Sequence, residues 1–154
     1  MATFDPYAEL LAIVKGFAGH GVPYALCGAV ALAIHGHPRA TKDVDLLVPE
    51  SCIDAAKTVL RGLGYTLEAA PMGFEGGIGV HRVSRVEERQ LFTVDLLTAV
   101  GPLREVWEDR IEARWQGVAI SAVSRAGLIT MKRLAKRARD LADLEALGAG
   151  DDEG

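Results

Sequence analysis

The spacing of apolar residues along the chain predicts a mixture of helices and short strands. A proline follows Asp5, and apolar residues at three- and four-residue spacing then predict a helix that ends near Gly19. Residues 23–27 form an apolar run typical of a short buried strand, and the alanine-rich residues 29–35 predict a short helix. Gly28 lies between the two. The early part of the chain is therefore expected to contain a strand, a glycine and a helix in direct succession.

The remaining apolar patterns predict further strands and helices without a strict β-α-β alternation. This order favours an α/β or α+β fold in which helices pack on a mixed β-sheet. We expect a single domain over 1–147 and a flexible acidic tail over 148–154. The later elements are expected as strands over 44–48, 65–69 and 118–121, helices over 51–63 and 103–111, a glycine-rich loop over 72–79, a hairpin of 80–86 and 90–98 around Glu87 and Glu88, and a last helix from 125 to about 147.

Composition excludes several classes of protein. The chain has 154 residues, of which 49% are hydrophobic and 25% charged, values typical of one globular domain rather than a disordered or fibrous protein. Its longest apolar run has eleven residues, Tyr24 to Ile34, and a membrane span needs roughly 20. Asp5 and Glu9 lie where a secretory signal would be basic and then apolar, so a cytoplasmic location is expected. Cys27 and Cys52 show neither disulfide nor metal-ligand spacing.

The distribution of charge is more informative than its total. A net charge of -4 argues against general binding of nucleic acid. Yet 113–139 contains seven basic residues and no acid, so an anion could be held locally. If 125–143 forms one continuous helix, its basic residues share a face, and Lys132 lies best placed for a triphosphate. Alternatively this face is solvated, with Lys136 and Arg139 paired to the acids four residues later.

Aspartates interrupt two strands that are otherwise apolar. Asp43 and Asp45 alternate within the segment 42–48, although aspartate is disfavoured in strands. Residues i and i+2 of a strand point to one face, where the two carboxylates would repel by about 2.5 kcal/mol unless a cation lies between them. Asp95 lies in a second strand of the same kind. The three together predict a Mg²⁺ site, whereas any one alone could cap a turn or lie at an exposed strand edge.

A possible phosphate site precedes these aspartates. Gly28 ends one predicted strand and opens one predicted helix, so backbone amides there could approach a phosphate closely. A tight turn that needs no side chain is the alternative explanation for this glycine. Arg39 and Thr41 follow, before the aspartate pair that begins fifteen residues after the glycine. The order of these residues favours a nucleotide over a simple turn.

Taken together, these segments resemble the signature of the nucleotidyltransferase superfamily. The matching residues are 26–36 and 38–48, and the subtype they most resemble is the small standalone enzymes similar to AbiEii-type toxins and related toxin–antitoxin proteins. Residues 94–97 are similar to the strand that carries the family's third carboxylate. Lys132 and 137–147 are similar to its C-terminal helical motif. The resemblance extends over most of the chain.

The resemblance implies an enzyme that transfers a nucleoside monophosphate from an NTP to an acceptor hydroxyl and releases pyrophosphate. Asp43, Asp45 and Asp95 would be its catalytic carboxylates and would hold two Mg²⁺ ions when an NTP is bound. The implied acceptor is tRNA, a protein or a small molecule such as an antibiotic, and a partner protein or a homodimer is compatible with the small size. The implied nucleotide-binding residues are Gly28, Ala29, Arg39, Thr41 and Lys132.

Two positions depart from the family's pattern. Ala29 stands where the family commonly has a second glycine or a serine, which removes either flexibility or a hydroxyl donor. This favours an alternative function, a catalytically inactive nucleotide-binding or antitoxin-like module of the same fold. Ala138 stands where the family often has proline, so the sequence predicts that the last helix continues unbroken.

Overall fold

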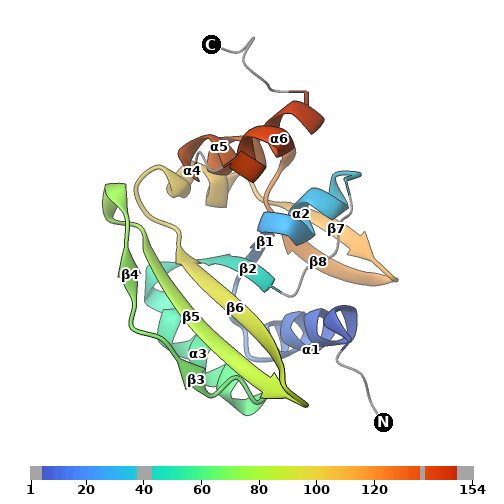
Figure 1. Ribbon diagram of the computed structural model, residues 1–154, viewed down its shortest axis with the longest axis vertical. Helices are drawn as coiled ribbons and strands as arrows, with labels where there is room; N and C mark the ends of the chain where they lie inside the picture. The colour runs from blue at the N-terminus through green and yellow to red at the C-terminus, as the bar shows by residue number, and fades with distance from the viewer. Residues whose placement is uncertain (1–4, 38–42, 136–137, 149–154) are drawn as a thin grey trace.

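One mixed sheet forms the centre of the molecule. The computed structural model describes residues 5–37, 43–135 and 138–148, and within these ranges eight strands form a single sheet (Figure 1). The strand order is β3-β5-β6-β2-β1-β8-β7, and β4 also pairs with β5. The expected mixed sheet with packed helices is confirmed. The strands are β1 (Ala25–Cys27), β2 (Asp43–Val48), β3 (Leu67–Glu68), β4 (Met72–Gly73), β5 (Gly79–Glu87), β6 (Gln90–Thr98), β7 (Ile111–Trp115) and β8 (Val118–Ala122).

The helices begin and end largely where the sequence predicts. Helix α1 starts with Pro6, and the Asp5 carboxylate accepts a hydrogen bond from the Tyr7 amide at 3.0 Å, as expected for an N-cap. Among the described helices, none is both long and apolar enough to cross a membrane. The α-helices are α1 (Pro6–Gly19), α2 (Gly28–Ile34), α3 (Ile53–Gly62), α4 (Leu103–Glu108), α5 (Arg125–Ala135) and α6 (Ala138–Ala146), and the 3₁₀ helices are η1 (Glu50–Cys52) and η2 (Glu75–Gly77).

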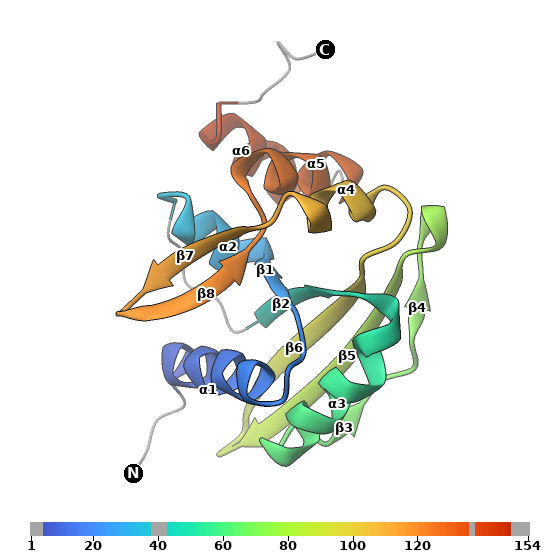
Figure 2. The same cartoon turned by 180° about the vertical axis from the view of Figure 1, so that it is seen from behind.

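The two faces of the sheet belong to separate apolar cores. Alternation along β2 places Val44, Leu46 and Val48 in the core with α1 and α3, and Leu47 in the core with α2, α4, α5 and α6. Figure 2 shows α1 and α3 packed together against the sheet, with α4, α5 and α6 gathered at its other end. The second group of helices leaves part of its face open, so the side chains of Val86 and Leu91 remain exposed there.

The turns of two hairpins lack the Asn-Gly, Asp-Gly or Gly-Gly pairs that would predict them from sequence. The predicted hairpin of β5 and β6 is confirmed, but its positive-φ turn residues are Glu88 and Arg89, one residue later than expected. Strand β7 was not predicted: the helix expected over 103–111 ends at Glu108, and the chain then pairs with β8. This second hairpin closes through positive φ at Gln116 and the glycine after it.

The C-terminal region forms two helices rather than the predicted continuous one. Lys132 Nζ lies 3.3 Å from Asp140 Oδ1 and 2.9 Å from Asp143 Oδ2. On one straight helix Lys132 and Asp143 would be about 16 Å apart along the axis, so α6 must pack back towards α5. The prediction from the missing proline was therefore wrong. Both acids face Lys132, while Lys136 and the side chain of Arg139 lie outside what the structure describes.

Candidate active site

The three aspartates lie on one face of two neighbouring strands. Strands β2 and β6 run parallel, and their register pairs Asp45 directly with Asp95. Parallel neighbours are about 4.8 Å apart and their paired side chains point to the same face. Asp43 precedes Asp45 by two residues and shares that face, where it is exposed. The structure thus brings together the carboxylates that the sequence singled out.

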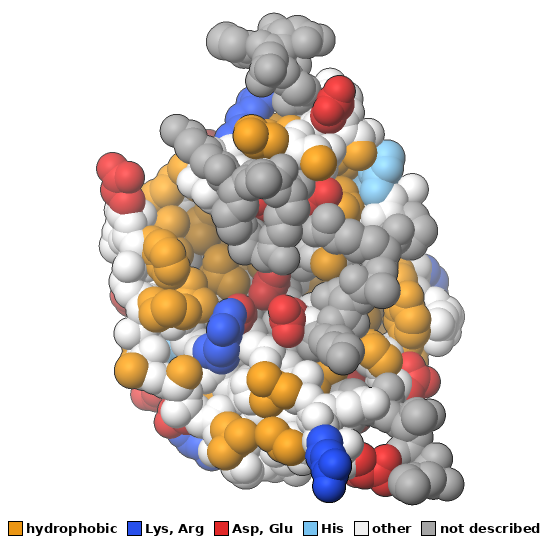
Figure 3. All heavy atoms as spheres, in the orientation of Figure 1, with side chains coloured by type: hydrophobic (Ala, Val, Ile, Leu, Met, Phe, Trp, Pro, Cys, Tyr) orange, Lys and Arg blue, Asp and Glu red, His pale blue; other side chains and the backbone are white. Residues whose placement is uncertain are grey.

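Asp43, Asp45 and Asp95 form a carboxylate row across β2 and β6. Arg82 extends this row onto β5, the next strand of the sheet. Strand β5 pairs Arg82 with Asp95 across the hairpin. The guanidinium donates from Nε to Asp95 Oδ1 at 2.8 Å and from one terminal nitrogen to Oδ2 at 2.9 Å. Figure 3 shows this face, with acidic side chains gathered beside a basic one near its middle. Sequence reasoning missed Arg82, and the only signal for it was the hairpin register.

Gly28 brings backbone directly against the Asp45 carboxylate. Its φ is +63°, and a Cβ at this position would lie 2.2 Å from Asp45 Oδ2. This glycine therefore serves both a left-handed turn and a close approach that any side chain would block. Ala29 follows in the first turn of α2, half-buried. The turn between β1 and α2 thus borders the carboxylate row, as the predicted nucleotide site requires.

Cys27 occupies the other end of the row and is chemically inert. It pairs with Asp45 across β1 and β2 and is buried. Burial raises the pKa of its thiol well above the ordinary value, and the nearby carboxylates of Asp45 and Asp95 raise it further, whereas the Lys132 ammonium lowers it. The thiol therefore stays protonated, and Cys27 packs as a small buried hydrophobe.

Lys132 is buried in an ion triad instead of lying on an exposed basic face. It is 4% exposed and forms an ion triad with Asp140 and Asp143, which are 0% and 6% exposed. Its ammonium is therefore already engaged by two acids, and its predicted contact with a triphosphate remains a prediction. Arg39 and Thr41, the other polar candidates for nucleotide binding, lie outside the described residues.

The donor chemistry of the row fits a hard divalent cation. Asp43, Asp45 and Asp95 offer carboxylate oxygens, the ligands that Mg²⁺ prefers. In the described part of the chain, however, no three His, Cys, Asp or Glu side chains converge enough to hold a metal ion by themselves. Proteins commonly bind Mg²⁺ through one or two carboxylates and substrate phosphates. The row therefore fits a metal that is bound jointly with a nucleotide.

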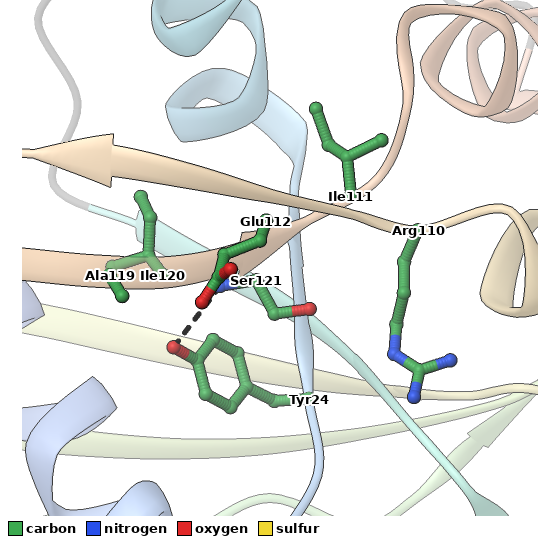
Figure 4. Close-up of a pocket in the computed structure, with 7 residues that line it drawn as sticks. All are labelled: Tyr24, Arg110, Ile111, Glu112, Ala119, Ile120 and Ser121. Atoms are coloured by element: carbon green, nitrogen blue, oxygen red, sulfur yellow. Dashed lines mark hydrogen bonds between the residues drawn. The ribbon is translucent and has the colours of Figure 1, made fainter.

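A separate pocket lies on the other side of β1 and contains none of the three aspartates. It opens beside β7 and β8 (Figure 4), where the Ser121 amide donates to Tyr24 Oη at 3.3 Å. Tyr24 directly precedes β1, whereas Cys27, at the far end of that strand, adjoins the carboxylate row. The remaining lining residues are Arg110, Ile111, Glu112, Ala119 and Ile120. We assign no chemistry to this pocket.

Comparison with known proteins identifies the fold through structure alone. No protein-family model and no curated protein sequence matches the chain. Among solved structures, the lincosamide antibiotic adenylyltransferase LnuA, lincomycin-bound, is 14% identical with a TM-score of 0.64, over 92% of this chain and 96% of that one. ANT(2'')-Ia in complex with adenylyl-2''-tobramycin is 14% identical with a TM-score of 0.64, over 95% of this chain and 90% of that one.

A bacterial structure from Thermotoga maritima gives the same result. TM1012, a candidate nucleotidyltransferase, is 14% identical with a TM-score of 0.61, and the match covers 92% of this chain and 88% of that one. At such low identity the likeness concerns the fold, and it extends over nearly the whole length of both chains. The eight-stranded mixed sheet with its packed helices is a nucleotidyltransferase-like fold.

Proposed function

We propose that the protein transfers a nucleoside monophosphate from an NTP to a hydroxyl group of a small molecule and releases pyrophosphate. The observation that carries this proposal is the register of β2 and β6, which pairs Asp45 with Asp95 on the face that also carries Asp43. Three carboxylates on one open face suit a reaction in which a highly charged triphosphate must be held and neutralised. Fold neighbours that include two antibiotic-modifying enzymes support the same reaction class.

Each aspartate has a distinct role in this proposal. Asp43 and Asp45 would hold Mg²⁺ together with the phosphate oxygens. Asp95 would contribute the third carboxylate of the metal site. The metal would lower the pKa of the acceptor hydroxyl and offset charge on the phosphates. The acceptor oxygen forms a bond to the α-phosphorus, the bond to the pyrophosphate oxygen breaks, and the hydroxyl proton passes to the Asp95 carboxylate. The turn at Gly28 would place backbone next to the phosphates.

A small-molecule acceptor is favoured by the extent of the structural match. LnuA is described with lincomycin, ANT(2'')-Ia with adenylylated tobramycin, and this chain covers 96% and 90% of their lengths. The net charge of -4 also disfavours a long RNA footprint. The toxin–antitoxin role, with tRNA or a protein as acceptor, is the alternative that the sequence resemblance implies.

The direct test is an assay of pyrophosphate release. The protein is incubated with each labelled NTP, Mg²⁺ and a panel of hydroxylated small molecules, and separately with total tRNA and with cellular protein. We expect release that depends on one acceptor class, with labelled monophosphate attached to that acceptor by mass spectrometry. Chelation of the metal with EDTA is expected to stop the release.

The alternative functions predict different results in the same assay. Label on tRNA or protein, with none on any small molecule, would replace our acceptor and support the toxin–antitoxin role. Nucleotide binding without release under any condition would identify an inactive nucleotide-binding module, the function that Ala29 favours. Absence of both binding and release would contradict the nucleotidyltransferase proposal itself.

Gly28→Ala is expected to slow nucleotide transfer about a hundredfold. The new Cβ would lie 2.2 Å from Asp45 Oδ2, so the carboxylate must move, and a shift of about 1 Å in a catalytic group can cost about that much. Gly21→Ala is the matched control, because Gly21 has φ +66° but a Cβ there would meet no heavy atom within 4 Å. Both variants should lose about 1–2 kcal/mol of stability from backbone strain. Equal rates of transfer in the two variants would contradict the role of the close approach.

A further inference from the structure

The Asp95 carboxylate is held at both of its oxygens by one side chain. Arg82 donates to Oδ1 at 2.8 Å and to Oδ2 at 2.9 Å, the paired geometry that fixes a carboxylate most firmly. Asp95 is largely buried at 13% exposure of its side chain, whereas the Arg82 side chain is 47% exposed. The arginine therefore reaches from the solvent side onto a carboxylate that is set into the sheet.

The influence of Arg82 extends to the rest of the carboxylate row. The hydrogen bonds and charge of Asp95 raise the pKa of Arg82, and the charges of Asp43 and Asp45 raise it further. All three aspartates therefore stabilise the charged guanidinium, and it in turn relieves part of their mutual repulsion. A fixed cation thus lies at the row in the absence of any metal.

A divalent cation and this guanidinium compete for the same carboxylate. Like charges repel, and a metal bound by Asp95 would lie within a few ångströms of Arg82. Each Asp95 oxygen accepts one hydrogen bond from Arg82 and keeps a second lone pair, so a metal could bind there only beside the guanidinium charge, which would weaken its binding. Among the described side chains, no three acidic, histidine or cysteine groups form a ready metal-binding cluster, although three carboxylates share a face.

We propose that Arg82 is a positioning residue for Asp95: it acts as the counter-cation of the metal-free carboxylate row and gives up Asp95 when a divalent cation arrives with the nucleotide. The inference rests on the proposed function, because it assigns Arg82 to the third carboxylate of that reaction. It goes beyond that function in making the affinity for free metal depend on a residue that binds no metal.

The test measures the affinity of the nucleotide-free protein for Mn²⁺ by electron paramagnetic resonance. Arg82→Gln is expected to bind Mn²⁺ about tenfold more tightly than the wild type, because a competing positive charge has been removed. Arg82→Lys keeps the charge but loses the paired hydrogen bonds, so its affinity should lie between the two. Arg104→Gln, which removes an exposed arginine on α4, is the matched control and should change the affinity less than twofold.

Thermal unfolding in EDTA separates positioning from a merely structural role. Arg82→Gln should unfold a few degrees lower than the wild type without metal, and an excess of Mn²⁺ should remove this difference. A lower unfolding temperature with unchanged or weaker Mn²⁺ affinity in both Arg82 variants would overturn the inference and leave a structural salt bridge.

Pyrophosphate release keeps this inference distinguishable from the proposed function. If the wild type releases pyrophosphate and Arg82→Gln binds Mn²⁺ no better, the inference fails while the proposed function stands. If no variant binds Mn²⁺ and the wild type releases no pyrophosphate, both fail. Tighter Mn²⁺ binding by Arg82→Gln in a protein that transfers no nucleotide would support the exchange of cations and reject the reaction.

Discussion

Asp45→Asn is expected to lower the rate of nucleotide transfer about a thousandfold or more. The substitution keeps the shape of the side chain but removes the charge that would hold Mg²⁺ beside the triphosphate, and such electrostatic stabilisation contributes several kcal/mol. Its neighbour across the strands is Asp95, and Asp43 lies two residues away. The stability of the metal-free protein should stay unchanged or rise, because one of three mutually repelling charges is gone.

Two measurements check this prediction together. Pyrophosphate release gives the rate, and thermal unfolding in EDTA gives the stability without metal. Asp54→Asn is the control, because it removes an exposed carboxylate on α3, which packs on the opposite face of the sheet. A marked loss of stability in Asp45→Asn without metal would identify Asp45 as a structural residue, and retained transfer would contradict its catalytic role.

The aspartates could be predicted because they violate a local preference. Aspartate is unfavourable in an apolar strand, so Asp43, Asp45 and Asp95 were recognisable from their positions in apolar segments of the sequence. Alternation also predicts that Asp43 and Asp45 share a face. The resemblance groups Asp95 with them, but the register that pairs it with Asp45 could not be predicted, because parallel register is set by packing between strands far apart in sequence. The pairing of Asp45 with Asp95 is therefore information that only the structure supplies.

Arg82 was missed because the sequence did not define the register of its hairpin. The predicted strands 80–86 and 90–98 leave three residues between them and define no register, whereas the observed two-residue turn at Glu88 and Arg89 pairs Arg82 with Asp95. Two-residue hairpin turns need positive φ, which glycine and asparagine adopt most easily. Neither residue is present here, so the sequence carried no local signal for the register.

The C-terminal helices show the limit of periodicity as a guide. A helical wheel drawn through 125–143 places Lys132 on a basic face, but the wheel assumes a single straight helix. The chain forms α5 and α6 instead, and their packing buries Lys132 against two acids. Charge pairs between separate helices depend on how the helices pack against each other, which neither helix propensity nor side-chain spacing specifies.

Lys132→Met is expected to lower the free energy of unfolding by about 3–5 kcal/mol. The ammonium lies 3.3 Å from Asp140 and 2.9 Å from Asp143, and all three side chains are buried. Methionine preserves most of the apolar volume but leaves two buried carboxylates without their shared cation, and removing one partner of a buried ion pair costs about that much. Urea denaturation at pH 7 measures the effect.

The cost should arise from the loss of the Lys132 charge beside two buried acids rather than from lost packing. Lys15→Met, which changes an exposed lysine on α1, should alter stability by less than about 0.5 kcal/mol. Adding Asp140→Asn and Asp143→Asn to Lys132→Met removes the buried negative charge, so part of the lost stability should return. If the triple variant is no more stable than Lys132→Met alone, packing and not charge holds α6 against α5. If Lys132→Met itself costs less than about 1 kcal/mol, the triad is not a stabilising contact, and Lys132 would be free to exchange its acids for a phosphate group.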